Sequence, residues 1–365
     1  MADSAAVVRP NRPASITIAG RQIPFRVCLF WAGVAFWIGN MWVQTGSAAM
    51  VALWASFAFL VEMVVLTSAT RTIRLSQVAK FCCLGGAMMS VVWLMDYGFT
   101  MFQPNFGISR EFFTPFVEET MKIAPVAVYV WLQRQTRARS LGASDVFLMA
   151  AASGAGFGLV EDAYVQHRFG AWHPATLMPT TAVMGASMTA GHQIWAALAG
   201  ASLGLALLWR PRKPFAFVLG LSGIVCSMID HFRNNFGVGR SGAVVTLLNW
   251  VGGRGWFVIY LFVIGVIAVL GSDLYAGHEM LTSHPQLKLR GGKPPEGFGQ
   301  GDGIKGLWAF LMARRSLAYV LFRWQRASGP TKENLAGLAA AMERRLNKPG
   351  VSGIAPRKPS AAAAS

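Results

Sequence analysis

The feature that most constrains the fold is a series of long apolar segments that follow one another along the chain. Each of the eight segments comes close to, or exceeds, the roughly 20 residues that an α-helix needs to cross the hydrocarbon core of a bilayer. They cover residues 27–45, 47–69, 78–102, 112–132, 144–166, 180–209, 215–236 and 243–271. Only 13% of the 365 residues are charged, whereas a soluble domain carries about 25%. The sequence therefore predicts an all-α membrane protein with about eight transmembrane helices.

Basic residues gather in every second connection between these segments. Clusters of arginine and lysine follow the second, fourth, sixth and eighth segments, and the N-terminal arm is also basic. Positively charged loops remain on the cytoplasmic side of a membrane. The alternation therefore predicts a multi-pass protein of the cell membrane with both termini in the cytoplasm. The net charge of +17 then reflects topology and contact with anionic lipid at the basic loops and tail, and no nucleic acid is expected as a partner.

The chain divides into three regions by composition. Residues 1–26 form a basic cytoplasmic arm, residues 27–271 the transmembrane domain, and residues 272–365 a cytoplasmic tail. In the tail, the glycine- and proline-rich residues 283–303 predict a linker. Residues 304–326 combine Trp, Leu and Phe with four arginines, which predicts an amphipathic helix on the anionic leaflet, with a partner-binding helix as the alternative. A short helix near 331–347 and an alanine-rich disordered end complete the prediction.

Polar side chains that are costly to place in lipid occur in four successive segments. A charged side chain at the bilayer centre costs at least about 2.5 kcal/mol, so such residues usually have a function. With the predicted topology, all of them lie at a similar depth in the outer half of the membrane, and we expect them to form one site. The residues are Glu118, Glu119, Lys122, Glu161, Asp162, His192, Asp230, His231 and Asn235.

Each of these groups also has a purely structural interpretation. Glu119 and Lys122 are three residues apart and can form an internal ion pair. Glu161 is close enough to a helix end to be a solvated loop charge. His192 can be a packing histidine, because it begins a ladder of small residues at four-residue spacing that reaches Gly204 and allows close helix contact. All of these interpretations must hold together for the site to be absent.

The chemistry of these residues leaves several functions open. A buried glutamate can act as a general base toward water. Two imidazoles and an amide can bind a metal or donate hydrogen bonds to an oxyanion. The set suits hydrolysis of an amide bond, and it also suits a proton- or cation-coupled transporter, although a transporter predicts an inverted repeat that the sequence does not show. A noncatalytic membrane scaffold that acts through its basic tail is the third hypothesis.

The order of the motifs resembles the PrsW family of intramembrane proteases, within the clan that includes the CAAX prenyl endopeptidases and bacteriocin-processing membrane proteases. The resemblance covers about residues 30–270. It rests on Glu118 and Glu119 with Lys122, then Phe157 with Glu161, then the isolated His192, then His231 with Asn235.

The resemblance implies an intramembrane endopeptidase that cleaves a single-span membrane protein, such as an anti-sigma factor, near the extracytoplasmic side. One of the adjacent glutamates would activate the water. His192 and His231 would bind a metal, zinc being the candidate, or polarise the scissile carbonyl. The HExxH pattern of many zinc proteases is absent, which slightly favours chemistry without a metal. The implied catalytic residues are Glu118, Glu119, Glu161, His192, His231 and Asn235.

Overall fold

The computed structural model describes residues 15–18, 21–102, 107–133, 140–169, 190–209, 213–237, 242–284 and 304–346. Nearly all of these residues are helical, as the sequence predicts. The exception is a hairpin in the N-terminal arm, where β1 (Ser15–Ile18) pairs antiparallel with β2 (Arg21–Pro24). The sequence analysis did not predict this hairpin.

Every predicted apolar segment contains a helix. The last segment is split, because α8 (Ala243–Val251) ends at a short 3₁₀ turn, η2 (Gly253–Gly255), before α9 (Trp256–Ser283) begins. Arg254 in this turn has a φ of 54°, which interrupts the helical path. The preceding helices are α1 (Phe25–Thr45), α2 (Ser47–Leu66), α3 (Leu75–Phe102), α4 (Gly107–Leu132), α5 (Ala143–Phe169), α6 (His192–Leu208) and α7 (Lys213–Gly237).

Among the described residues, five stretches of helix are long and apolar enough to cross a membrane. They lie in α2, α3, α5 and α7 and in the stretch from η2 through α9. The chain is therefore a multi-pass membrane protein. Helix α6 has 17 residues and begins at His192, after the extended residue Gly191, whereas residues 180–189 of its predicted segment lie outside the described part of the chain. The count of eight spans and the cytoplasmic location of both termini remain predictions.

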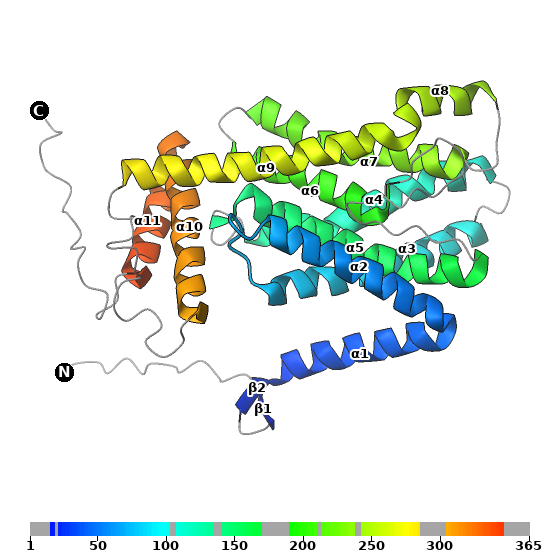
Figure 1. Cartoon of the computed structure of the whole chain (residues 1–365), viewed down its shortest axis with the longest axis horizontal. Coiled ribbons are helices and arrows are strands. Elements are labelled where there is room, and N and C mark those ends of the chain that lie inside the picture. The colour runs from blue at the N-terminus through cyan, green and yellow to red at the C-terminus, as the bar shows by residue number, and fades with distance from the viewer. Residues whose placement is uncertain are drawn as a thin grey trace, which may run out of the picture.

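Helix α5 is the centre of the bundle (Figure 1), and residues 143–160 of its apolar stretch are all buried. Glycines allow α3 to approach it closely. A Cβ atom added to Gly85 would collide with the backbone oxygen of Ser153, and one added to Gly156 would collide with the backbone oxygen of Cys82. The two helices therefore touch backbone to backbone, which fixes the position of every side chain that α5 carries.

The ladder of small residues on α6 packs against α5, as predicted. A Cβ atom on Gly200 would collide with the Cβ atom of Ala150, and one on Gly204 would lie 2.5 Å from the backbone oxygen of Ala143. From the α5 side, a Cβ atom on Gly154 would lie 2.6 Å from the backbone oxygen of His192. This close packing holds the first turn of α6 against α5.

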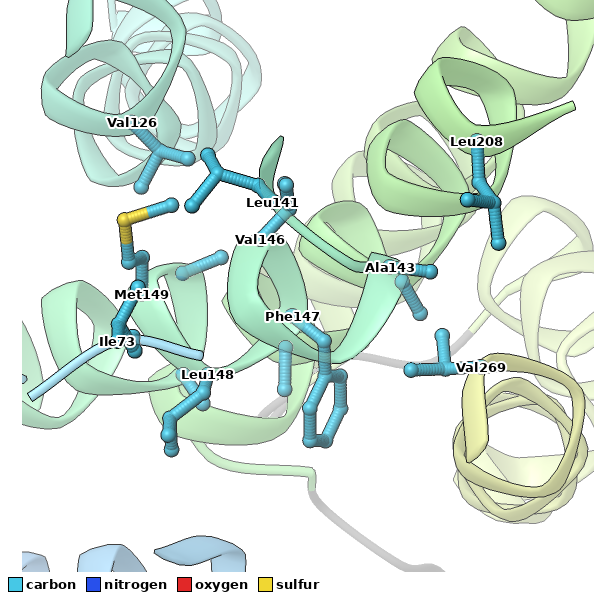
Figure 2. Close-up of a cluster of buried hydrophobic side chains, with 14 of the residues drawn as sticks. Ile73, Val126, Leu141, Ala143, Val146, Phe147, Leu148, Met149, Leu208 and Val269 are labelled. Carbon is cyan, nitrogen blue, oxygen red and sulfur yellow. The ribbon is translucent and has the colours of Figure 1, made fainter. Parts of the chain in front are cut away.

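The first turn of α5 is fixed by two buried carboxylates within the largest apolar cluster, part of which is shown in Figure 2. Asp273 of α9 accepts hydrogen bonds from the backbone N–H groups of Ala143 and Ser144, both at 2.8 Å. Asp145 accepts one from the N–H group of Gly142 at 2.8 Å and another from that of Ile73 at 3.0 Å. The contacts of Asp273 satisfy the first N–H groups of α5, which have no partner within the helix itself, and those of Asp145 tie the start of α5 to the turn between α2 and α3.

The tail forms two helices, α10 (Ile304–Arg326) and α11 (Gly329–Leu346), and α10 runs across the end of the bundle (Figure 1). The pattern of α10 is amphipathic, as predicted, but much of its apolar face packs against the protein. Contact of its basic residues with anionic lipid remains a prediction. The buried residues are Phe310, Met312, Leu317, Ala318, Tyr319, Val320, Leu321 and Phe322.

Candidate active site

Four helices bring the predicted polar residues together, as the shared depth in the sequence indicated. Their side chains meet through direct contacts of 2.6 to 4.0 Å. α4 supplies Glu118, Glu119 and Lys122, α5 supplies Glu161, α6 supplies His192 in its first turn, and α7 supplies His231 and Asn235.

Glu119 orients the ring of His231. The Oε1 atom of Glu119 lies 2.7 Å from Nδ1 of His231 and 2.6 Å from Nζ of Lys122. An ionised carboxylate can only accept hydrogen bonds, so Nδ1 of His231 carries the hydrogen and Nε2 carries the lone pair. This Nε2 atom lies 3.2 Å from Nδ2 of Asn235 and 3.6 Å from Oε2 of Glu118.

Glu161 contacts the ring of His192 in the way that Glu119 contacts the ring of His231. Its Oε2 atom lies 2.9 Å from Nε2 of His192. Because the ammonium group of Lys122 can only donate, its contact with Nδ1 places the lone pair on Nδ1 and the hydrogen on Nε2. The Nδ1 atom accepts a hydrogen bond from Lys122 and lies 4.0 Å from Oε2 of Glu118. Glu161 therefore belongs to the same polar cluster as His192, and it lies within helix α5 and not in a loop.

One ring nitrogen of each histidine lies near the same atom, Oε2 of Glu118: Nδ1 of His192 at 4.0 Å and Nε2 of His231 at 3.6 Å. This oxygen is buried and has no hydrogen-bond partner in the described structure. Ligand atoms of Glu118, His192 and His231 all lie within 4.8 Å of one another. One oxygen and two nitrogens match the three protein ligands of a catalytic zinc site, and metal-bound histidines commonly place their second nitrogen on a carboxylate. The residues present therefore fit a metal ion.

Lys122 is the counter-charge of this site. Its side chain is fully buried, and its Nζ atom lies 4.7 Å from the ring centre of Phe157 and 5.2 Å from that of Trp195. The predicted ion pair between Glu119 and Lys122 is confirmed, and it belongs to the site instead of replacing it. Buried carboxylates need such a partner because the membrane interior does not solvate charge.

Sequence reasoning missed Trp195, which holds the other face of the His231 ring. The two rings are stacked with centroids 4.3 Å apart and an interplanar angle of 16°. The indole N–H group donates to Oδ2 of Asp230 at 2.9 Å, and Oδ1 of Asp230 accepts from Nε of Arg233 at 2.8 Å. Asp230 thus supports His231 indirectly. The spacing of Trp195 three residues after His192, on the same helix face, was the signal available in the sequence.

The site is closed on the side of the adjacent glutamates and more open on the side of Glu161. Glu118 and Glu119 are 4% and 2% exposed, whereas Glu161, Asp162 and Asn235 are only half-buried. Glu161 and Asn235 are therefore the members of the cluster nearest to solvent or lipid. Residues 170–189, which connect α5 to α6, lie outside the described part of the chain.

Comparison with known proteins gives one match. The family model described as "PrsW family intramembrane metalloprotease" matches residues 45–270, which is well over half of the chain and contains every residue of the site. No curated protein and no solved structure matches the chain.

Proposed function

This chain belongs to the PrsW family of intramembrane proteases. We propose that it hydrolyses a peptide bond of a membrane-anchored protein, and that the reaction takes place at the polar cluster around its own Glu118. The observation that carries the proposal is the grouping of a nitrogen of His192 and a nitrogen of His231, at 4.0 and 3.6 Å, around the unpartnered Oε2 atom of Glu118. A cluster that serves only for packing gains nothing from an unpartnered carboxylate oxygen. A hydrolytic site needs such an oxygen, because it must bind water or a metal.

The ligand set we propose for a metal is Oε2 of Glu118, Nδ1 of His192 and Nε2 of His231. Three neutral or anionic ligands of this kind suit zinc. When bound, the metal supplies Lewis-acid polarisation of the scissile carbonyl and of the attacking water. The HExxH pattern is not required for this, because here the ligands come from three different helices.

The remaining carboxylates have separate roles in this proposal. Glu119 keeps His231 in the tautomer that offers Nε2, and Lys122 balances its charge. Glu161 is the carboxylate nearest to the open side, so it takes the proton of the water when Glu118 serves as a ligand. Without a metal, Glu118 itself is the general base.

Asn235 is placed to receive the substrate. Its Nδ2 atom lies 3.2 Å from Nε2 of His231 on the half-buried side of the site, so it can donate a hydrogen bond to the oxyanion that forms from the scissile carbonyl. With the predicted topology this side faces the outer half of the bilayer. The proposed substrate is accordingly a single-span protein, of the anti-sigma-factor type, that is cut near its extracytoplasmic end.

The test is cleavage of a single-span substrate by the full-length protein in liposomes. Glu118→Gln and His231→Ala should abolish cleavage, and Glu333→Gln, on the exposed surface of α11, should not. Cleavage by both site variants at the wild-type rate would show that the site is elsewhere. Loss of cleavage after chelation, with recovery on addition of zinc, supports the metal mechanism, whereas full activity of metal-free protein assigns Glu118 as the base.

A further inference from the structure

Arginine side chains gather at the end of the bundle remote from the catalytic centre, where α10 meets the turn between α2 and α3. Arg71 belongs to this turn, and Arg314 and Arg315 belong to α10. Helix α5 runs from this end to the site, and Glu161 lies about 24 Å along it from Asp145, at 1.5 Å per residue. The cluster is therefore separate from the catalytic machinery.

Arg71 and Arg315 flank a single aromatic ring. Their guanidinium carbons lie 5.2 and 5.6 Å from the ring centre of Trp308. Nη1 of Arg315 donates to the backbone oxygens of Ser68 at 2.9 Å and of Arg71 at 3.4 Å, and Nη1 of Arg71 donates to that of Ile73 at 2.9 Å. Both side chains are thus held in place by neutral carbonyl groups.

The three positive charges of Arg71, Arg314 and Arg315 are electrostatically unfavourable next to one another. Burial lowers the pKa of Arg71, Asp145 raises it in part, and Arg315 lowers it again. Burial also lowers the pKa of Arg314, and Arg315 adds to that effect. Like charges in a partly desolvated position repel one another more strongly than in water, so the three arginines need a compensating negative charge.

Asp145 is the acidic group whose charge raises the pKa of Arg71, but its carboxylate oxygens already accept hydrogen bonds from other groups. They accept hydrogen bonds from the backbone N–H groups of Thr72 at 2.6 Å, Ile73 at 3.0 Å and Gly142 at 2.8 Å. Across the described residues, no salt bridge joins Arg71 or either of its two neighbours on α10 to a carboxylate. Asp145 therefore acts on the arginines at a distance and forms no direct ion pair with them in the described structure.

One hydrogen-bond donor of the arginine cluster has no acceptor in the described structure. Arg71 is only 6% exposed, and its Nε atom is buried without a hydrogen-bond partner in the described structure. Elsewhere on α10, Arg326 is paired with a carboxylate, since it contacts both side-chain oxygens of Glu279 at 3.0 and 2.9 Å. Leaving a buried donor unpaired costs roughly 1–3 kcal/mol, which suggests that a ligand completes it.

We propose that Arg71 and Arg315, with Arg314 beside them, bind a phosphate group that fastens α10 to the turn between α2 and α3. Arginine is suited to this, because its planar guanidinium donates two parallel hydrogen bonds to phosphate oxygens. Helix α10 runs across the end of the bundle (Figure 1), and the predicted topology places this end at the cytoplasmic membrane surface. The phosphate belongs either to an anionic phospholipid or to a free phosphate ion.

The experiment uses the full-length protein in nanodiscs and measures its thermal unfolding. One arm compares phosphatidylcholine alone with phosphatidylcholine containing phosphatidylglycerol, and the other adds inorganic phosphate to phosphatidylcholine nanodiscs. The variant is Arg71→Gln with Arg315→Gln. The matched control, Arg326→Gln with Lys332→Gln, removes the same charge from the tail outside the cluster.

We expect the wild type and the control to unfold at a higher temperature with the anionic ligand, and the cluster variant to lose this shift. A shift with phosphatidylglycerol alone identifies a lipid, and a shift with inorganic phosphate identifies the free ion. If the double variant does not fold, Arg315→Lys replaces it and should weaken the binding of inorganic phosphate or phosphatidylglycerol roughly ten- to hundred-fold. An equal shift in the cluster variant and the control, or no shift in the wild type, would overturn the proposal.

Discussion

The Nε2 atom of His231 faces the Oε2 atom of Glu118 across 3.6 Å, and that oxygen has no hydrogen bond in the described structure. Its neighbour Glu119 is the opposite case, because one of its oxygens already contacts both Lys122 and His231. Two adjacent glutamates, which the sequence does not distinguish, therefore have different surroundings. One is free to bind a ligand or water, and the other is used to hold the site together.

This difference predicts different effects of the same substitution at the two positions. Glu118→Gln should lower the rate of proteolysis by at least about 100-fold, the usual effect of losing a general base, and should also abolish metal retention if a metal is bound. Glu119→Gln removes a carboxylate that supports a histidine and should weaken metal affinity roughly 10- to 100-fold. Metal content of the purified variants and single-turnover cleavage measure the two effects. Equal metal loss in both variants would contradict the assignment.

Lys122→Met should destabilise the protein more than the loss of one surface ion pair would. It leaves Glu119 buried without its cation, and breaking a buried pair costs about 3–5 kcal/mol. Thermal unfolding in detergent measures the loss. The double variant Lys122→Met with Glu119→Gln removes both charges and should be more stable than Lys122→Met alone. Additive destabilisation by the two substitutions would show that Lys122 and Glu119 are not energetically coupled.

Residue spacing and topology predicted which helices carry the site, because a charge inside an apolar segment is visible in the sequence. They also predicted the close packing of α6 through its small residues. They did not reveal which nitrogen of His192 or His231 faces a carboxylate, since that depends on rotamers fixed by packing. The role of Trp195 was missed for a related reason: a tryptophan in an apolar segment is indistinguishable from a core residue until its stacking partner is known.

The sequence of the tail also predicts the type of helix but not what the helix packs against. The pattern of α10 predicted an amphipathic helix, and the structure confirms the amphipathic character. A pattern does not tell whether the apolar face meets lipid or protein, and here residues such as Tyr319 and Phe322 are buried against the bundle. The break before α9 was predictable, because glycines interrupt an otherwise apolar segment at Gly252 and Gly253.

Trp195 and Asp230 should act as positioning residues for His231. Trp195→Phe keeps an aromatic ring over His231 but loses the hydrogen bond to Asp230, and Asp230→Asn weakens the same contact. Each should reduce metal affinity, or the cleavage rate without a metal, by roughly 10- to 100-fold, since a hydrogen bond to a charged group contributes roughly 1.5–3 kcal/mol. The double variant should lose little more than either single variant. Fully additive losses would show that the two residues support the site independently.

The approach of α3 to α5 should control both stability and activity. A Cβ atom on Gly156 would collide with the backbone oxygen of Cys82, so Gly156→Ala must push the two helices apart at a cost of about 1–3 kcal/mol. Because Glu161 lies further along the same helix, its contact with His192 should weaken, and the cleavage rate should fall together with the unfolding temperature.

Gly98→Ala is the matched control for this substitution. Gly98 lies in α3, and an added Cβ atom there meets nothing within 4 Å. Alanine is favoured over glycine by up to about 1 kcal/mol within a helix, so this variant should be as stable as the wild type or slightly more so, with unchanged cleavage. If Gly156→Ala and Gly98→Ala unfold at the same temperature and cleave at the same rate, the contact between α3 and α5 does not set the geometry of the site.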